Sequence, residues 1–419
     1  MRYLFDRSIV VFLTSFFCVI VFDPSNSLTG AKEYLFLAIF SWWLINQADK
    51  KKLNTNTYKS FFIFCSFGLS FPIFSISSYF FQGGDFKDYE GFKSLIGFLA
   101  LGFLILIGSN EILALRLFVK VLTLQAMTTI NIYLFLTFNP EFVEIVTIFG
   151  YKYGFLWIND KYYGDFQFLQ VFFKTAPFMV LPLAYYSNEY FNRTENRTGT
   201  VLILLITCCI ALLISGTRAN IAFGLCIPAY FLVINFYKIS LSKRMFFITI
   251  ALIFLVILGI NSSIIFAMLS PNEESNAVKI GYWPDYIELF SDPIVLLFGQ
   301  GIGASHYFNS LGLTLLITEL SYFELIRNFG LLLGCLYFGF FIAPIFLLKK
   351  RIFTKFRWLK IAYACYLLIA VSNYFIMSST GMVLLSIVYA LCFSSIHKNG
   401  ISLRNTSIDG HIKNVMQSR

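Results

Sequence analysis

The sequence predicts an all-α, polytopic integral membrane protein with about twelve transmembrane helices. Hydrophobic residues make up 58% of the 419 residues and charged residues only 13%, which is about half the charged fraction of a soluble domain. Apolar runs of about 20 residues, the length that crosses a hydrocarbon core, recur along the whole chain. A β-barrel would show alternating strands of about ten residues instead.

The first expected span follows a basic start and is not followed by a small-residue cleavage site, so we interpret it as a retained span. The others follow the apolar runs in order. The twelve expected spans are residues 5–22, 33–47, 60–80, 94–109, 116–138, 166–187, 200–215, 219–237, 245–268, 321–347, 360–376 and 380–397.

Basic connections orient these spans. Lysine and arginine gather in residues 49–59, 238–244 and 349–360 and in the tail, about 398–419. With twelve spans these segments lie on the same side as both termini, which the positive-inside rule makes the cytoplasm. The net charge of +10 then reflects topology, and no nucleic-acid partner is expected.

The remaining long connections lie on the outer face of a single membrane domain, residues 1–419. They are about 139–165 and 269–320, and the second is the longest segment outside the expected spans. Long connections in compact proteins usually carry function. We therefore expect the active site on the outer face, which is the periplasm in a Gram-negative cell.

Several classes of site are not expected. All eight cysteines fall in apolar runs, which argues against disulfides, and the three histidines are far apart, which argues against a metal site. No phosphate-binding loop is present, and the glycines of GQGIG (299–303) lack the third glycine of a dinucleotide fingerprint. We expect neither a metal nor another cofactor.

A polar turn, Ser215-Gly216-Thr217-Arg218, interrupts apolar sequence at the outer end of two spans. Arg218 could simply extend its charge to the membrane surface. Alternatively, its guanidinium and the N–H groups of the following helix start could hold an anionic group such as a diphosphate.

The second outer loop carries LFGQGIGASHYFN (297–309), and TELSYFELIRNFGLLLG (318–334) opens the next span. Together with Trp283, the SGTR turn and the layout of spans, these stretches resemble the family of O-antigen polymerases (Wzy) and O-antigen ligases of the bacterial inner membrane. The family often has an arginine upstream of the tryptophan. Here the nearest basic residue is Lys279.

The resemblance implies a fold related to the C class of membrane glycosyltransferases. It also implies a polymerase that transfers a growing glycan from undecaprenyl diphosphate to a sugar hydroxyl of the next lipid-linked unit, without a nucleotide sugar. The expected partners are the donor and acceptor oligosaccharides on undecaprenyl diphosphate and membrane lipids, with a chain-length regulator as a further candidate.

Such a reaction needs cations for the departing diphosphate and a base for the acceptor hydroxyl. Arg218, Arg327 and Lys279 are the candidate cations, although Arg327 could instead pair with Glu324, three residues away on the helix. His306 is the first candidate base, since the resemblance to the ligases implies a loop histidine. The carboxylates of Glu319 and Glu324 are the alternatives.

Aromatic residues could hold the sugars. Tyr151, Tyr153 and Trp157 lie in the first outer loop and Trp283 in the second. Tyrosine and tryptophan are also enriched at every membrane interface, so a belt without ligand is the other interpretation.

Two other functions share this layout. An O-antigen ligase would use the same donor and transfer the polymer to a lipid A core sugar. A flippase or another transporter also commonly has twelve spans, but it usually has two similar halves, and no such repeat is visible.

Overall fold

The computed structural model describes residues 2–48, 55–81, 102, 111–163, 166–192, 198–238, 241, 244–245, 248–249, 266, 270–348, 350–373 and 375–393. Most of these residues are helical. The helices are α1 (Arg2–Phe22), α2 (Lys32–Ala48), α3 (Thr55–Phe81), α5 (Glu111–Phe138), α6 (Val143–Tyr153), α7 (Val180–Asn192), α8 (Thr198–Ile214), α9 (Arg218–Asn235), α12 (Glu274–Leu289), α13 (Pro293–Phe298), α14 (Ser321–Leu347) and α15 (Lys350–Ile369), with a further helix over Ser379–Phe393.

Two antiparallel hairpins and four single turns of 3-10 helix complete the described chain. The strands are β1 (Leu156–Tyr163) paired with β2 (Phe166–Phe173), and β3 (His306–Phe308) paired with β4 (Leu313–Leu315). The 3-10 turns are η2 (Pro140–Phe142), η3 (Ala176–Met179), η4 (Phe236–Lys238) and η5 (Ala370–Ser372).

Three described helices are long and apolar enough to cross a membrane: Glu111–Phe138, Arg218–Lys238 and Ser321–Leu347. Shorter apolar helices cover Ser8–Phe22, Gly68–Phe81, Gly199–Ile214 and Ser379–Phe393, where spans are also expected. These helices indicate a protein embedded in a membrane. The expected span 94–109, most of 245–268 and the tail 398–419 lie outside the described residues.

The expected span over 166–187 is wrong. Its first eight residues are β2, which pairs with β1 from Leu156–Phe173 to Tyr163–Phe166, and α7 begins only at Val180. The apolar residues of FQFLQVFF are aromatic or β-branched in most positions, and such residues favour a pleated strand when another strand can pair with it.

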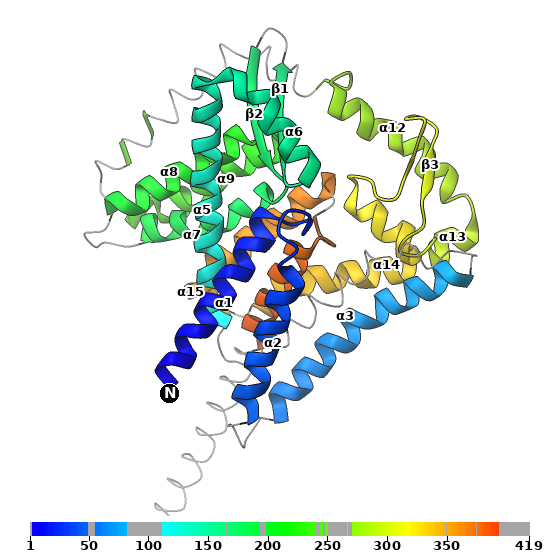
Figure 1. Ribbon diagram of the computed structural model, residues 1–419, viewed down its shortest axis with the longest axis horizontal. Coiled ribbons are helices and arrows are strands. Elements are labelled where there is room, and N and C mark those ends of the chain that lie inside the picture. Colours follow the sequence, from blue (N-terminus) through cyan, green and yellow to red (C-terminus); the bar gives the residue numbers. More distant parts are fainter. Residues whose placement is uncertain are drawn as a thin grey trace, which may run out of the picture.

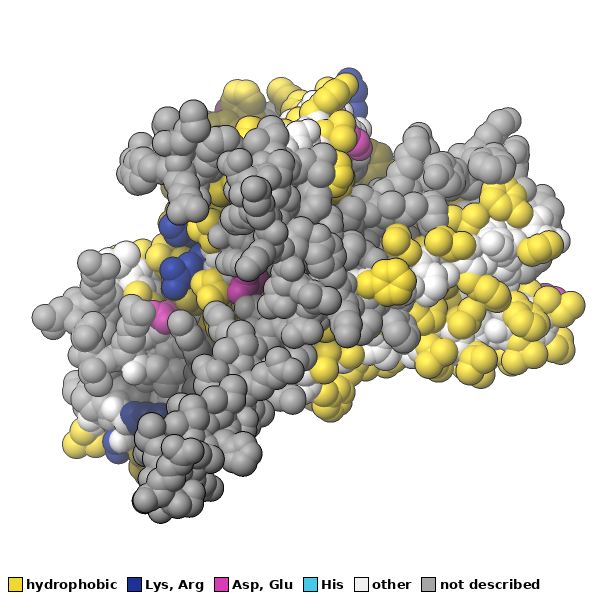
Figure 2. All heavy atoms as spheres, turned by 90° about the horizontal axis from the view of Figure 1, so that it is seen from below, with side chains coloured by type: hydrophobic (Ala, Val, Ile, Leu, Met, Phe, Trp, Pro, Cys, Tyr) yellow, Lys and Arg dark blue, Asp and Glu magenta, His cyan; other side chains and the backbone are white. Residues whose placement is uncertain are grey.

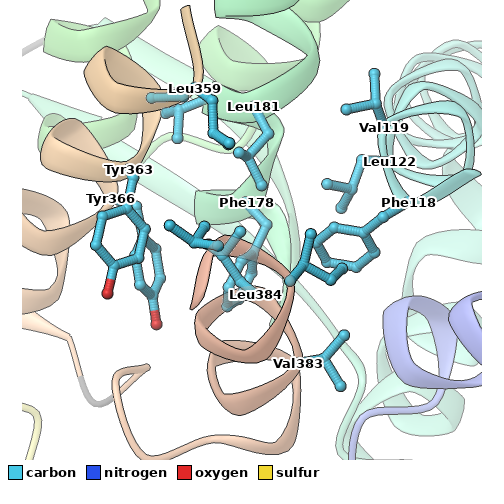
Figure 3. Close-up of a cluster of buried hydrophobic side chains, with 14 of the residues drawn as sticks. Phe118, Val119, Leu122, Phe178, Leu181, Leu359, Tyr363, Tyr366, Val383 and Leu384 are labelled. Atoms are coloured by element: carbon cyan, nitrogen blue, oxygen red, sulfur yellow. The ribbon is translucent and has the colours of Figure 1, made fainter. Parts of the chain in front are cut away.

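A continuous apolar core joins α1, α5, α7, α15 and the last helix (Figure 3). Phe178 packs on Tyr366 with ring centroids 4.8 Å apart, and both side chains are fully buried. Two buried tyrosines of this core use main-chain acceptors: Tyr363 donates to Phe341 O at 2.7 Å and Tyr366 to Phe375 O at 2.9 Å. These bonds remove the cost of burying a hydroxyl.

The β1–β2 hairpin and α6 lie at one end of this bundle (Figure 1). Helix α6 ends at Tyr153 and is capped by Gly154, which has a left-handed φ of 63°. The hydroxyls of Ser25 and Ser27, from the connection between α1 and α2, donate to Tyr153 O at 3.0 and 2.5 Å. The first expected outer loop, 139–165, is thus largely ordered as η2, α6 and β1.

The second expected outer loop is also folded. Residues 270–320, which we call the cap, contain α12, α13 and the β3–β4 hairpin and lie beside α14 and α3 (Figure 1). The cap has a small core of its own, formed by Tyr282, Tyr286, Leu289, Val295, Phe308 and Leu320.

Apolar side chains continue from the spans onto α13. Ile73 and Phe74 of α3, Leu332 of α14, and Ile294 and Leu297 of α13 are all more than half exposed except Phe74, at 40%. Figure 2 shows hydrophobic side chains over the end of the molecule that holds α3 and α13. An apolar surface of this extent is typical of contact with lipid.

Candidate functional site

Helix α14 is broken at Gly330, where φ is 73° and ψ is 172°. The break leaves main-chain carbonyls of the preceding turn without helical partners, and two other segments supply donors. Gln300 N–H donates to Arg327 O at 2.6 Å, and Ser75 Oγ–H donates to Asn328 O at 2.5 Å. The break is therefore hydrogen-bonded by the cap and by α3, as discontinuous helices in membranes require.

Glycines allow these segments to come this close. A Cβ on Gly330 would lie 2.1 Å from Leu297 O, and one on Gly299 would lie 2.5 Å from Gly330 N. A Cβ on Gly301 would lie 2.5 Å from Ser75 O. The glycines of GQGIG thus serve main-chain packing between α3, the cap and the break in α14.

Arg327 lies one turn before the break and is 1% exposed. Its Nη2 is 2.7 Å from Glu324 Oε2, and its Nε donates to the same carboxylate at 3.1 Å. The other donors reach Ala304 O at 2.7 Å, Leu316 O at 2.5 Å and Gln300 Oε1 at 3.4 Å. Each guanidinium nitrogen therefore has a protein acceptor, and the pairing with Glu324, which the sequence left open as the alternative to diphosphate binding, is present.

Glu324 is equally buried and has two further donors from the cap. Tyr286 Oη–H donates to it at 2.7 Å and Thr318 Oγ1–H at 3.0 Å. Burial raises the pKa of Tyr286, and the adjacent carboxylate raises it further. The phenol therefore stays protonated and donates to Glu324, so this carboxylate is occupied in joining the cap to α14.

Arg218 is the first residue of α9 and lies two residues after Gly216, which has a left-handed φ of 65°. Gln170 of β2 holds the turn by donating to Ser215 O at 2.6 Å. The Arg218 guanidinium pairs with Glu273 and also donates to Asn276. Its side chain keeps 25% exposure, so Arg218 links the end of a span to the beginning of α12 while remaining accessible.

Lys279 and Glu319 form a second pair at the surface of the cap. Lys279 Nζ lies 3.3 Å from Glu319 Oε2, and the two side chains are 24% and 56% exposed. An exposed pair of this kind contributes little to stability. It leaves both groups free to exchange partners.

His306 is half-buried on β3, with its ring 5.0 Å from that of Phe308 in an edge-on contact. Burial and the nearby Arg327 charge lower the pKa of His306, while Asp285, Glu288 and Glu324 oppose this shift. The imidazole is therefore neutral at pH 7, the form that a general base needs.

Asp285 faces this region from α12. Its carboxylate is buried, and it accepts the main-chain N–H of Asn309 at 3.1 Å and the hydroxyl of Ser310 at 2.8 Å. Burial raises its pKa, but the bonds from Ser310 and Asn309 and the proximity of His306 outweigh burial and lower it. Asp285 thus stays charged and fixes the loop that follows β3.

Helix α12 separates the candidate residues. Arg218 contacts its first turn, Lys279 follows in the middle, and His306 lies near Asp285 and Glu288 in its last turns. Residues 273 and 285 are about 18 Å apart along a helix that rises ~1.5 Å per residue. The diphosphate candidate Arg218 and the base candidate His306 therefore lie toward opposite ends of one cap helix.

The aromatic candidates fall into two groups. Tyr151 is 74% exposed on α6, Tyr153 ends that helix, and Trp157 on β1 packs across the hairpin on Phe172 with centroids 5.8 Å apart. Trp283 belongs to the cap, where it is 49% exposed. Tyr151 and Trp283 thus present rings that are open to a ligand or to a membrane interface.

The sequence reasoning missed the residues that assemble this site. No local pattern marks Ser75, Gln300 or Asp285, because their partners are 24 or more residues away in the chain. Gly330 did carry a signal, since a glycine inside an apolar helical run weakens the helix. No family model matches this chain, and no curated protein matches it.

Proposed function

We propose that this protein polymerises oligosaccharide units carried on undecaprenyl diphosphate at the periplasmic face of the bacterial inner membrane. The single observation that carries the proposal is Arg218, a guanidinium that stays accessible at the junction between the end of a span and the cap. The planar guanidinium, with its fork of N–H donors at the end of a span, suits the diphosphate of a lipid carrier.

The proposed reaction is one glycosyl transfer. The acceptor sugar hydroxyl forms a bond to the anomeric carbon of the donor glycan, and the bond from that carbon to the diphosphate oxygen breaks. His306 takes the proton of the hydroxyl. Lys279, which lies between Arg218 and His306 along α12, stabilises the negative charge that the departing diphosphate gains, and Arg218 binds the lipid diphosphate farther from the reacting carbon.

In this proposal Glu319 is the partner of Lys279 and not the first candidate for the base. It is paired with Lys279 at 3.3 Å, so it would hold Lys279 until a diphosphate displaces it. Arg327 and Glu324 act as positioning residues, because their polar atoms bind the cap segments that flank His306. Tyr151, Tyr153, Trp157 and Trp283 are proposed to stack on sugar rings.

Deletion of the gene in the native strain, followed by gel analysis of surface polysaccharide, tests the function. Loss of the ladder with one core-linked repeat retained is expected for a polymerase. Loss of all core-linked sugar would contradict the proposal and would indicate a ligase or a flippase.

Arg218→Lys tests the proposed role of the guanidinium. Lysine keeps the charge and can still pair with Glu273, but it lacks the planar fork. Loss of one of two charge-assisted bonds costs about 1.5–3 kcal/mol, which corresponds to a fall in rate of about ten- to a hundredfold when the bond forms in the transition state. Polymer yield in a complementation assay, normalised to the protein in the membrane, measures it.

Glu273→Gln is the matched control, because it removes the negative charge that pairs with Arg218 but retains an acceptor for the N–H of Asn276. If Arg218 binds a diphosphate, this variant keeps its activity, since the competing carboxylate is gone. If Arg218 only attaches α12 to α9, Glu273→Gln loses as much polymer as Arg218→Lys, and the phosphate role is wrong.

A further inference from the structure

The exposed side of α5 marks where lipid begins and ends along this span. Near the start of the helix it carries Arg116 and Lys120, and exposed charges of this kind stay out of the hydrocarbon core. The following stretch, 121–138, contains no charged residue. About 20 helical residues cross a core about 30 Å thick, so lipid that begins at Lys120 reaches the level of Pro140. The exposed Phe138 at the end of α5 therefore lies at the edge of the bilayer.

The apolar surface of α5 continues onto α6. The ring of Phe142, in η2, packs on the exposed Phe135 of α5 with centroids 5.5 Å apart. On α6 itself, Ile145 and Ile148 are 62% and 60% exposed, and Phe149 is exposed as well. Residues three and four apart lie on one side of a helix. We call this surface, formed by Phe142, Ile145, Ile148 and Phe149, the α6 face.

The opposite side of α6 packs on the β1–β2 hairpin. Gly150 is buried there, and a Cβ on it would lie 2.5 Å from Leu156 O. The carbonyl of Gly150 accepts the N–H of Phe155 at 3.3 Å. Val143 and Val146 pack against the core that the hairpin shares with α5. The α6 face points away from these contacts and is left exposed, although a helix side that faces water normally carries polar residues.

The charges of α6 lie at its two ends. Glu141 and Glu144 are at the start and Lys152 is in the last turn, while residues 145–151 carry no charge. With 11 residues, α6 is about 16 Å long and too short to cross a membrane. An apolar side between charged ends suits the boundary between acyl chains and headgroups, which the long stem of Lys152 can reach.

We propose that the α6 face binds the lipid acyl chains at the end of α5, so that α6 is a lipid anchor and not part of a water-exposed loop. Continuity favours lipid over a protein partner, because the α6 face extends the α5 surface that the bilayer covers, and α6 lies beside that end of α5 (Figure 1). The hairpin connects this anchor to the SGTR turn, since Gln170 of β2 donates to Ser215 O at 2.6 Å. The proposal is independent of the proposed reaction.

Photo-crosslinking from the α6 face identifies what covers it. Benzoylphenylalanine replaces Ile148 in the full chain, in cell membranes that contain radiolabelled phospholipid. The same amino acid in place of Asp160, which is exposed on β1, is the control. On illumination, the chain labelled at position 148 should acquire several-fold more phospholipid than the control.

Equal phospholipid labelling at positions 148 and 160 would overturn the proposal. A crosslink from position 148 to a second copy of the chain, or to another protein, as the main product would overturn it too, because the α6 face would then be a protein interface.

Two substitutions at Ile148 test the same contact without a crosslinker. Glutamate is a better helix former than isoleucine and would face Lys152, one turn later, so Ile148→Glu should not destabilise a helix side that faces water. Against acyl chains the carboxylate is costly, whereas tryptophan is favoured at the edge of a bilayer. In phosphatidylcholine nanodiscs, Ile148→Glu should therefore unfold several degrees below the unmodified chain, and Ile148→Trp at about the same temperature as that chain.

Equal melting temperatures for Ile148→Glu and Ile148→Trp, or a higher one for Ile148→Glu, would show that water covers the α6 face and would overturn the proposal. Neither experiment requires turnover. Failure of the lipid contact is therefore distinct from failure of the proposed function, which the gel of surface polysaccharide reports.

Discussion

The pKa of His306 decides how the proposed reaction depends on pH. Burial and Arg327 lower it from its usual value of 6.5. Catalysis by the neutral imidazole therefore persists below pH 6.5 and falls only as the pH drops through the lower, folded-state pKa. Polymerisation measured in membrane vesicles across this range should show an acid limb with an apparent pKa below 6.5.

The same shift has a consequence for stability. Because the folded-state pKa is lowered, the contribution of His306 to the stability of the cap is fully present above pH 6.5 and is lost as the pH falls through the folded-state value. Asp285, whose pKa is also lowered, behaves in the same sense at still lower pH. Normal polymer from His306→Gln would assign the proton transfer to Glu319, and an acid limb at or above 6.5 would contradict the lowered pKa of His306.

At the scale of single residues, the charge of a side chain did not predict whether it is able to bind a diphosphate. Arg327 and Lys279 were both expected to meet a diphosphate, yet one is saturated by buried acceptors and the other is held by an exposed carboxylate. The pair of Arg327 and Glu324 could be anticipated because the two residues are three apart on one helix. Lys279 and Glu319 lie near opposite ends of the cap sequence, so their contact could not be anticipated in this way.

At the scale of elements, the break in α14 should be sensitive to a single methyl group. Gly330→Ala places a Cβ 2.1 Å from Leu297 O at a left-handed φ, and strain of that kind costs at least about 1–2 kcal/mol. Thermal unfolding of the protein in detergent should show a lower melting temperature, and the polymer yield should fall with it.

Gly339→Ala provides a control within the same helix. Its Cβ would meet no atom within 4 Å, and alanine in a helix interior is more stable than glycine by about 0.5–1 kcal/mol. The melting temperature should stay the same or rise. If Gly330→Ala behaves like Gly339→Ala, the helix is not broken in the membrane.

The β1–β2 hairpin shows that an apolar run long enough for a span can instead contain a strand. Residues 166–187 are apolar enough for a span, but Gly164-Asp165 stands between two aromatic-rich runs, and a two-residue glycine connection is a hairpin signal. The apolar face of this hairpin packs on Leu136 and Phe22, so a strand could satisfy the same hydrophobic pattern.

For the molecule as a whole, reporter fusions test the orientation in the membrane. A reporter fused after Lys355 should report the cytoplasm, and one inserted at 272–278, in the first turns of the cap, should report the outer side, because basic connections stay inside. Either reporter on the opposite side would reverse the topology and remove the periplasmic site from the proposal.

The sequence by itself determined that this is a helical protein embedded in a membrane, and it located α1, α5, α9 and α14 to within a few residues. Composition and the lengths of apolar runs carry that information, because the cost of exposing polar backbone to lipid is local to each segment. The position of Arg218 at the end of a span could also be predicted locally, because the SGTR turn interrupts apolar sequence.

Only the tertiary structure decided which charges are occupied and what the long loops do. The bonds from Gln300 and Ser75 to the broken helix join segments up to 253 residues apart. No local pattern encodes such contacts. They depend on the packing of helices around a shared core, which places polar groups from distant segments where each can satisfy the other.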